Sequence, residues 1–199
     1  VKGDHIMKGY YNNPEATSKE IIDNWFHTGD VGEVDNNGFV SITGRKKEIY
    51  VSSAGKNIAP LVIEETMKSI PLVSQCFLVG DNKNYCTALI TLDVGVILRD
   101  KFSMDSNKIP KDPSEQLKVL ISKGKKLDDF TSSEEIFGEI EIKINELNNE
   151  FSNPEQIKKF TILPRDFTID DGELTPTLKI RRKQILENWS SEVSSMYDK

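Results

Sequence analysis

Three polar loops in this sequence carry side chains whose types suit phosphate or sugar groups. Asp30 stands on a tight turn after a Thr-Gly pair, and an ionised aspartate can accept both hydrogens of a vicinal diol such as that of ribose. Arg45 belongs to a positively charged cluster, and its guanidinium offers a rigid fork of donors to phosphate or ribose oxygens. Lys179 follows Pro176 on a loop ahead of a helical pattern, where an ammonium suits a developing phosphate or carboxylate charge.

Each of these three residues has a commoner structural role when it is taken alone. A turn aspartate such as Asp30 usually binds its own backbone. A charged cluster such as the one around Arg45 is usually a solvated surface, and a single loop lysine such as Lys179 is usually a surface residue. The three loops therefore become informative only through their combination and order along the chain.

The composition excludes several classes of protein. The chain has 199 residues, with 26 Lys and Arg against 32 Asp and Glu, and a net charge of −6. This acidic balance argues against a nucleic-acid binder, which needs clustered positive charge. Two histidines exclude a multi-histidine metal site, and Cys76 and Cys86 give neither a disulfide framework nor a zinc spacing. No metal ligands are therefore predicted.

The length of the chain and its first residues indicate its domain organisation and its cellular compartment. The length fits one domain, or a small domain with part of another. No apolar run is long enough to cross a bilayer and no charged-then-apolar leader opens the chain, so the cytosol is the expected compartment. The chain starts at Val1 rather than at a methionine, and we therefore expect it to be a piece of something longer.

The hydrophobic patterning predicts a mixture of strands and helices. Asn-Asn-Gly at 36–38 predicts a β-hairpin between strands 31–35 and 39–43. A polar break is expected at 44–47, with an extended segment at 48–51. Further strands are expected at 73–80, 85–92 and 160–169, and helices at 15–22, 60–69 and 180–197.

The segment 100–153 is charged and helical in character. One apolar stripe runs along it at helical spacing, made of Ile136, Ile140, Ile144, Leu147 and Phe151. A surface helix packed on a small core explains this stripe better than a cofactor site does.

Several motifs in a fixed order give the sequence a family resemblance. They are MKGYYNNPEAT at 7–17, WFHTGD at 25–30, GF at 38–39, TGRKKE at 43–48, GKNIAP at 55–60 and LTPTLK at 174–179. Together they resemble the adenylate-forming superfamily, and within it the long-chain fatty acyl-CoA synthetases, including the bubblegum-like branch. The resemblance covers nearly the whole chain and is weakest across 100–153.

The resemblance implies a two-step reaction carried out by a larger protein. A fatty carboxylate attacks the α-phosphate of ATP, with Mg²⁺ stabilising phosphate charge, and coenzyme A then displaces AMP to form a thioester. Residues 1–46 would be the β-rich end of the N-terminal adenylating (AMP-binding) domain. Residues 47–199 would be the mobile C-terminal domain of α+β class, a small mixed sheet covered by helices, with an insertion around 100–153.

The same resemblance assigns roles to the three polar loops. Asp30 would bind the ribose hydroxyls, and Arg45 would reach the ribose or the α-phosphate. Lys179 matches the adenylation lysine, which bridges the carboxylate and the α-phosphate. Leu178 departs from the pattern, because many relatives carry glycine just before this lysine.

Two further segments acquire roles in the same way. Lys47 matches the hinge between the two domains, where many relatives have aspartate. Gly55, Lys56 and Asn57 lie on the loop that approaches the pantetheine arm of coenzyme A, where a missing side chain leaves room for it. A Ser/Thr/Gly-rich phosphate loop is absent from the sequence, so we expect the chain by itself to be inactive.

Two alternatives to this ligase stay open at the level of the sequence. One is a non-catalytic module that has kept the fold, although the joint presence of Asp30, Arg45 and Lys179 argues against it. The other is an adenylate-forming enzyme with a different acyl acceptor. The expected partners are fatty acid, ATP, coenzyme A and the missing N-terminal domain, and peripheral association with the endoplasmic reticulum or another membrane stays open.

Overall fold

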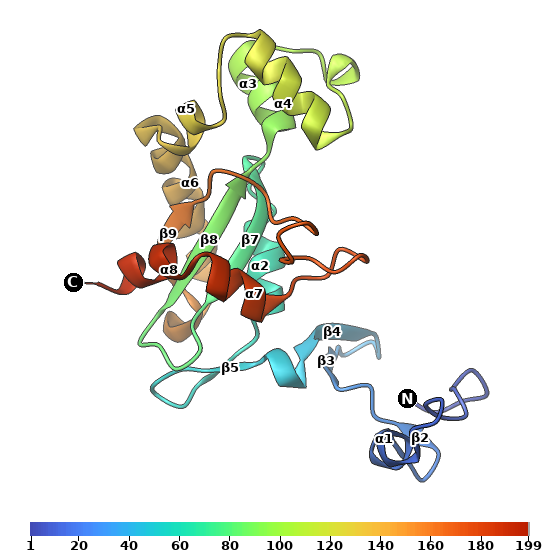
Figure 1. Cartoon of the computed structure of the whole chain (residues 1–199). Helices are drawn as coiled ribbons and strands as arrows, with labels where there is room; N and C mark the ends of the chain where they lie inside the picture. Colours follow the sequence, from blue (N-terminus) through green and yellow to red (C-terminus); the bar gives the residue numbers. More distant parts are fainter. Residues whose placement is uncertain (199) are drawn as a thin grey trace. The chain divides into compact units, whose positions relative to one another are not determined.

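The computed structural model describes residues 1–198, and the chain falls into two compact units, Val1–Ile49 and Tyr50–Lys199. Each unit is described by itself below, and Figure 1 labels their helices and strands. Among residues 1–198, no helix combines the length and the apolar character needed to cross a membrane.

The first unit consists of short elements. A side-chain cap starts its α-helix, because the Asn13 side chain accepts a hydrogen bond from the Ala16 N–H at 3.0 Å and Pro14 occupies the first turn. In chain order the elements are α1 (Pro14–Glu20), β1 (Ile21–Ile22), β2 (Trp25–Phe26), β3 (Asp30–Val34), β4 (Val40–Arg45) and the 3₁₀-helix η1 (Lys46–Glu48).

The predicted β-hairpin is confirmed as the antiparallel pair β3–β4. Its turn is held by the Asp35 carboxylate, which accepts hydrogen bonds from the backbone N–H groups of Asn37 and Phe39, each at 2.8 Å. The polar break predicted at 44–47 begins later than expected, because the strand pairing continues past a bulge and Asp30 pairs with Arg45. The extended segment predicted at 48–51 is a 3₁₀-helical turn at its start, and only Tyr50–Val51 is a strand.

The first unit has almost no core of its own. Gly44 is the one fully buried residue in the range 1–49. Large apolar side chains of the hairpin stand in solvent, with Phe39 72% exposed and Val40 68% exposed. Because a two-stranded ribbon is marginally stable without something to pack on, this unit depends on further contacts for stability.

The second unit is built on a three-stranded sheet of order β7–β8–β9. β7 (Val73–Val79) and β8 (Cys86–Leu92) are antiparallel, and β9 (Ile157–Ile162) lies parallel to β8. All seven residues of β8 are buried, as expected for a central strand covered on both faces. A separate two-stranded pair, β5 (Tyr50–Val51) and β6 (Asn57–Ile58), precedes it. The prediction of a small mixed sheet in an α+β fold is confirmed.

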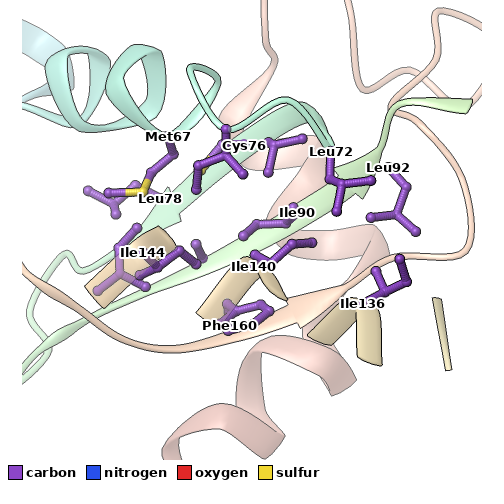
Figure 2. Close-up of a cluster of buried hydrophobic side chains, with 14 of the residues drawn as sticks. Met67, Leu72, Cys76, Leu78, Ile90, Leu92, Ile136, Ile140, Ile144 and Phe160 are labelled. Carbon is purple, nitrogen blue, oxygen red and sulfur yellow. The ribbon is translucent and has the colours of Figure 1, made fainter. Parts of the chain in front are cut away.

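Helices cover both faces of this sheet (Figure 1). On one face, α2 (Pro60–Met67) and α6 (Glu134–Leu147) pack against side chains such as Leu78 and Ile90, as Figure 2 shows. On the other face, α7 (Arg182–Asn188) and α8 (Ser190–Tyr197) cover Phe77 and Leu89. The remaining elements between β8 and β9 are α3 (Val94–Phe102), η2 (Ser106–Lys108), α4 (Pro113–Ser122), α5 (Asp128–Thr131), η3 (Asn148–Glu150) and η4 (Asn153–Glu155).

The helical character predicted for 100–153 is confirmed, and so is the reading of its stripe as core. Ile136, Ile140 and Ile144 are at most 2% exposed and point into the sheet from α6 (Figure 2). Leu147 and Phe151 pack on the same cluster while partly exposed.

Two predictions near the C-terminus are corrected by the structure. The strand predicted at 160–169 is Ile157–Ile162, and the chain leaves the sheet where Pro164 cannot donate a backbone hydrogen bond. The single helix predicted at 180–197 is interrupted at Trp189, whose φ and ψ of −113° and 29° are not helical. Its indole Nε1 donates a 2.8 Å hydrogen bond to the buried Glu173, so tertiary bonding sets this break.

Candidate functional site

The structure brings together the two residues expected to bind a nucleotide in the first unit. Asp30 opens β3 and Arg45 closes β4, where they are paired across the ladder. The Arg45 Nε lies 3.1 Å from the Asp30 Oδ1, and both side chains are partly exposed to solvent. An exposed ion pair contributes little to stability, at most about 1 kcal/mol. The remaining lone pairs of the Asp30 carboxylate can still accept hydrogen bonds from hydroxyl groups.

An open cavity of about 700 Å³ lies beside this pair. Asp30 and Lys47 both line it, together with the aromatic side chains of Trp25 and Phe26. A few polar groups against apolar and aromatic walls are typical of sites for small organic ligands. Gly29 shapes its rim with a φ of +75°, and its carbonyl accepts a 2.8 Å hydrogen bond from the Lys46 N–H.

Lys179 lies in the second unit on a loop closed by its own hydrogen bonds. Leu174 and Ile180 form a single β-bridge across the base of the loop. The Thr175 N–H donates to the Lys179 carbonyl at 2.8 Å, and the Thr175 hydroxyl accepts from the Lys179 N–H at 3.0 Å. Within residues 1–198, no ion pair holds the exposed Lys179 ammonium. The loop therefore fixes the backbone of this lysine and leaves its charge accessible.

Leu178 sits in this loop in a backbone conformation that favours glycine. Its φ is +60°, and its side chain is 68% exposed. A left-handed conformation costs an L-residue roughly 1–2 kcal/mol because Cβ crowds the following carbonyl. The departure from glycine noted in the sequence therefore falls at a strained position.

We expect Leu178→Gly to raise the free energy of unfolding of the chain by about 0.5–1 kcal/mol, the relief of strain less the extra entropy of glycine in the unfolded state. Leu178→Ala keeps Cβ and the strain, so it should leave stability nearly unchanged. Urea unfolding of both variants measures this difference. Equal stabilities of the glycine and alanine variants would contradict the assignment of strain to this residue.

A buried carboxylate that the sequence did not reveal anchors the chain before Lys179. Glu173 is fully buried, and its oxygens accept hydrogen bonds from both terminal nitrogens of Arg165, at 2.7 and 3.1 Å. The Thr168 N–H, Asn188 Nδ2 and Trp189 Nε1 also donate to it, at 2.8–3.1 Å. Burial by itself raises the pKa of Glu173, but these donors outweigh it and hold the pKa below its usual range.

A second buried carboxylate, Glu64, belongs to α2. Glu64 of α2 is 2% exposed and receives a two-pronged hydrogen bond from Arg182, at 2.8 and 2.7 Å. Its Oε1 also accepts the Leu78 N–H at 2.8 Å. The Tyr50 hydroxyl accepts from Arg182 at 2.9 Å and donates to the Leu78 carbonyl at 2.7 Å. This second network has no sequence signature, because Glu64 and Arg182 lie 118 residues apart along the chain.

The loop expected to approach coenzyme A is an exposed turn between β5 and β6. Gly55 has a φ of +74°, and its N–H donates to the Ser52 carbonyl at 2.8 Å. A Cβ added at Gly55 would meet no atom within 4 Å, so glycine is required here for its conformation rather than for space. Lys56 is exposed beside it, and Asn57 begins β6. Lys179 and this turn occupy different loops of the second unit.

No cluster of side chains suited to a metal ion is found in the part of the chain that the structure describes. Among residues 1–198 there is no group of three or more His, Cys, Asp and Glu side chains placed to hold an ion. Mg²⁺ bound with ATP is held mainly by substrate phosphates and water, with one or two carboxylates, and we assign no residue of this chain to that ion.

Comparison with known proteins places these features in context. Residues 47–106 and 112–199 match the family described as AMP-binding enzyme C-terminal domain. Long-chain-fatty-acid–CoA ligase FadD15 of Mycobacterium tuberculosis is 40% identical over all 199 residues, which cover 31% of that protein. Human long-chain-fatty-acid–CoA ligase ACSBG1 is 34% identical over 98% of this chain and 27% of its own length.

A solved structure shares the fold. The didomain of carboxylic acid reductase from Segniliparus rugosus, determined with AMP, superposes with a TM-score of 0.66 at 21% identity. The match covers 98% of this chain and 24% of that one. The chain thus spans less than a third of the length of these relatives.

Proposed function

This chain belongs to the AMP-binding enzyme C-terminal domain family, and from that premise we propose that the full-length protein is an ATP-dependent long-chain fatty acid–CoA ligase. It activates a fatty acid with ATP to an acyl-adenylate and then transfers the acyl group to coenzyme A. The observation that carries the proposal is the sequence similarity to ligases that bear this name, at 40% identity over the whole chain for one and 34% identity over 98% of it for another.

We further propose that residues 1–46 end an N-terminal adenylating domain and that residues 47–199 are a mobile C-terminal domain hinged at Lys47. The family match begins at residue 47, and the chain divides into compact units close to that position, at Ile49. The lack of a core in the first unit supports its being part of a larger domain. A hinge residue absorbs large changes in φ and ψ, and Lys47 lies in a single exposed 3₁₀ turn.

In the proposed mechanism each loop has one task. Asp30 accepts hydrogen bonds from the ribose hydroxyls of ATP. Arg45 lies on the facing strand and reaches the ribose or the α-phosphate. The Lys179 ammonium neutralises charge as the fatty carboxylate attacks the α-phosphate. In the second step the turn at Gly55–Asn57 lies along the pantetheine arm of coenzyme A.

The full-length protein incubated with ATP, palmitate and coenzyme A should form palmitoyl-CoA, AMP and pyrophosphate, while residues 1–199 alone should stay at background. Pyrophosphate release and thioester formation measure the two steps separately. Adenylation without thioester would indicate a different acyl acceptor, and absence of both would favour a non-catalytic module. Turnover by the 199-residue chain would overturn the proposed domain division.

A further inference from the structure

Three side chains form a clamp around the buried Glu64 carboxylate, and the clamp is defined here as Tyr50, Glu64 and Arg182. Arg182 is the first residue of α7 and donates two hydrogen bonds to the Glu64 carboxylate. One of its nitrogens also donates to the Tyr50 hydroxyl. Its guanidinium lies 5.6 Å from the centre of the Tyr50 ring and 5.2 Å from that of Phe77, so it is held by cation–π contacts as well.

The clamp is fixed to the sheet through its edge strand. β7 lies at one edge of the three-stranded sheet. The Leu78 N–H donates to Glu64 and the Leu78 carbonyl accepts from Tyr50, so both backbone groups of this residue bond to the clamp. Buried backbone groups must be paired, which makes the position of the clamp relative to β7 highly specific. The two Glu64 oxygens and the planar Arg182 guanidinium therefore restrict the position of the first residue of α7.

This arrangement lies close to Lys179 along the chain. Arg182 follows Lys179 by three residues, a span of at most about 11 Å for an extended backbone. On the other side, the buried Glu173 anchors the chain ahead of the Lys179 loop. The β-bridge between Leu174 and Ile180 joins these two anchored segments. The backbone that carries Lys179 is thus held between two anchored segments.

We propose that Arg182, held by Glu64 and Tyr50, is a positioning residue that aims Lys179 during adenylation. The inference rests on the proposed function, since it takes Lys179 to act in the first step. Tyr50 follows the proposed hinge Lys47 by three residues, so the clamp also ties the start of the mobile domain to the Lys179 loop.

The test compares the two half-reactions in the full-length protein. Arg182→Lys keeps the positive charge but cannot reproduce the two-pronged, planar contact with Glu64. A small displacement of a reacting group is costly, so we expect acyl-adenylate formation to fall on the order of 10- to 100-fold. Thioester formation from synthetic acyl-adenylate and coenzyme A should stay close to the parental rate, and the KM for ATP should change little.

A matched control separates positioning from general destabilisation. Leu120 is fully buried in α4, away from the Lys179 loop, and Leu120→Ala should lower stability while leaving the ratio of the two rates unchanged. Tyr50→Phe removes one oxygen from the clamp and should lower the ratio by a few-fold. If Arg182→Lys does not fold, the Tyr50→Phe variant tests the positioning role by itself.

The outcomes distinguish this inference from the proposed function. A selective fall of the adenylation rate in the clamp variants, absent from Leu120→Ala, supports the inference. Equal loss in both half-reactions, or no change of the ratio, overturns it even when the parental protein is an active ligase. A parental protein that forms no acyl-adenylate overturns the proposed function, and the inference with it.

Discussion

Lys179→Ala in the full-length protein is expected to lower the rate of acyl-adenylate formation by about 10²–10³, which corresponds to roughly 2.7–4 kcal/mol of lost transition-state stabilisation. The reason is electrostatic. In the proposed mechanism the ammonium meets the charge that develops between carboxylate and α-phosphate, and it is carried by a loop whose backbone is already fixed by hydrogen bonds. Release of pyrophosphate from ATP and palmitate in a single turnover measures this step.

The second half-reaction serves as the internal control for Lys179. Supplied with synthetic acyl-adenylate and coenzyme A, the same variant should make thioester at close to the parental rate. Lys183→Ala provides a matched surface control, because Lys183 is also an exposed lysine, 92% accessible, on the adjoining helix. Its rates should be unchanged in both assays. A Lys179 variant equally impaired in the second assay would contradict the two-step division of labour.

Glu173→Gln should lower the free energy of unfolding of the 199-residue chain by about 1–3 kcal/mol, as is typical when buried hydrogen-bonding groups lose their partner. The amide replaces a charged acceptor facing Arg165 and presents its own N–H groups to the donors of Asn188 and Trp189. Glu187→Gln, an exposed carboxylate 3.7 Å from Lys183, should cost less than about 1 kcal/mol. Denaturant unfolding of the two variants measures the difference.

The pH dependence of stability gives a second readout of Glu173. Its folded pKa lies below its unfolded value of about 4.3, so its contribution is present above that pH and is lost as pH falls through the folded pKa. The parental chain should therefore lose stability steeply below about pH 4. Glu173→Gln should show a shallower loss in that range. An identical acid slope in both proteins would contradict the role assigned to this carboxylate.

The sequence was sufficient for features that depend on local patterns. Asn-Asn-Gly at 36–38 identified the β3–β4 hairpin, and the spacing of Ile136, Ile140 and Ile144 identified the buried face of α6. Asp30 and Arg45 were selected by residue type and motif, and hairpin register then paired them. In each case the information lies within a few residues, which is where turn chemistry and hydrophobic periodicity operate.

What the sequence could not supply depends on contacts between distant segments. The break at Trp189 follows from its bond to Glu173, and helical periodicity across 180–197 gives no sign of it. Local patterns around 60–69 do not mark Glu64 as buried, and Arg182, the partner of this buried carboxylate, lies 118 residues further along the chain. The roles proposed for Lys47 and for Gly55–Asn57 stay predictions from the resemblance.

The parallel pairing of β8 with β9 sets an order for the folding of the second unit. β7 and β8 are joined by a short turn and can pair from neighbouring residues, whereas β9 meets β8 only after the whole segment 93–156 has been brought round. Closing so long a loop costs entropy before the strand contacts repay it, which makes this step slow. Because Lys179 follows β9 in the chain and its loop is anchored on Glu173, we expect the Lys179 loop to reach its native form last.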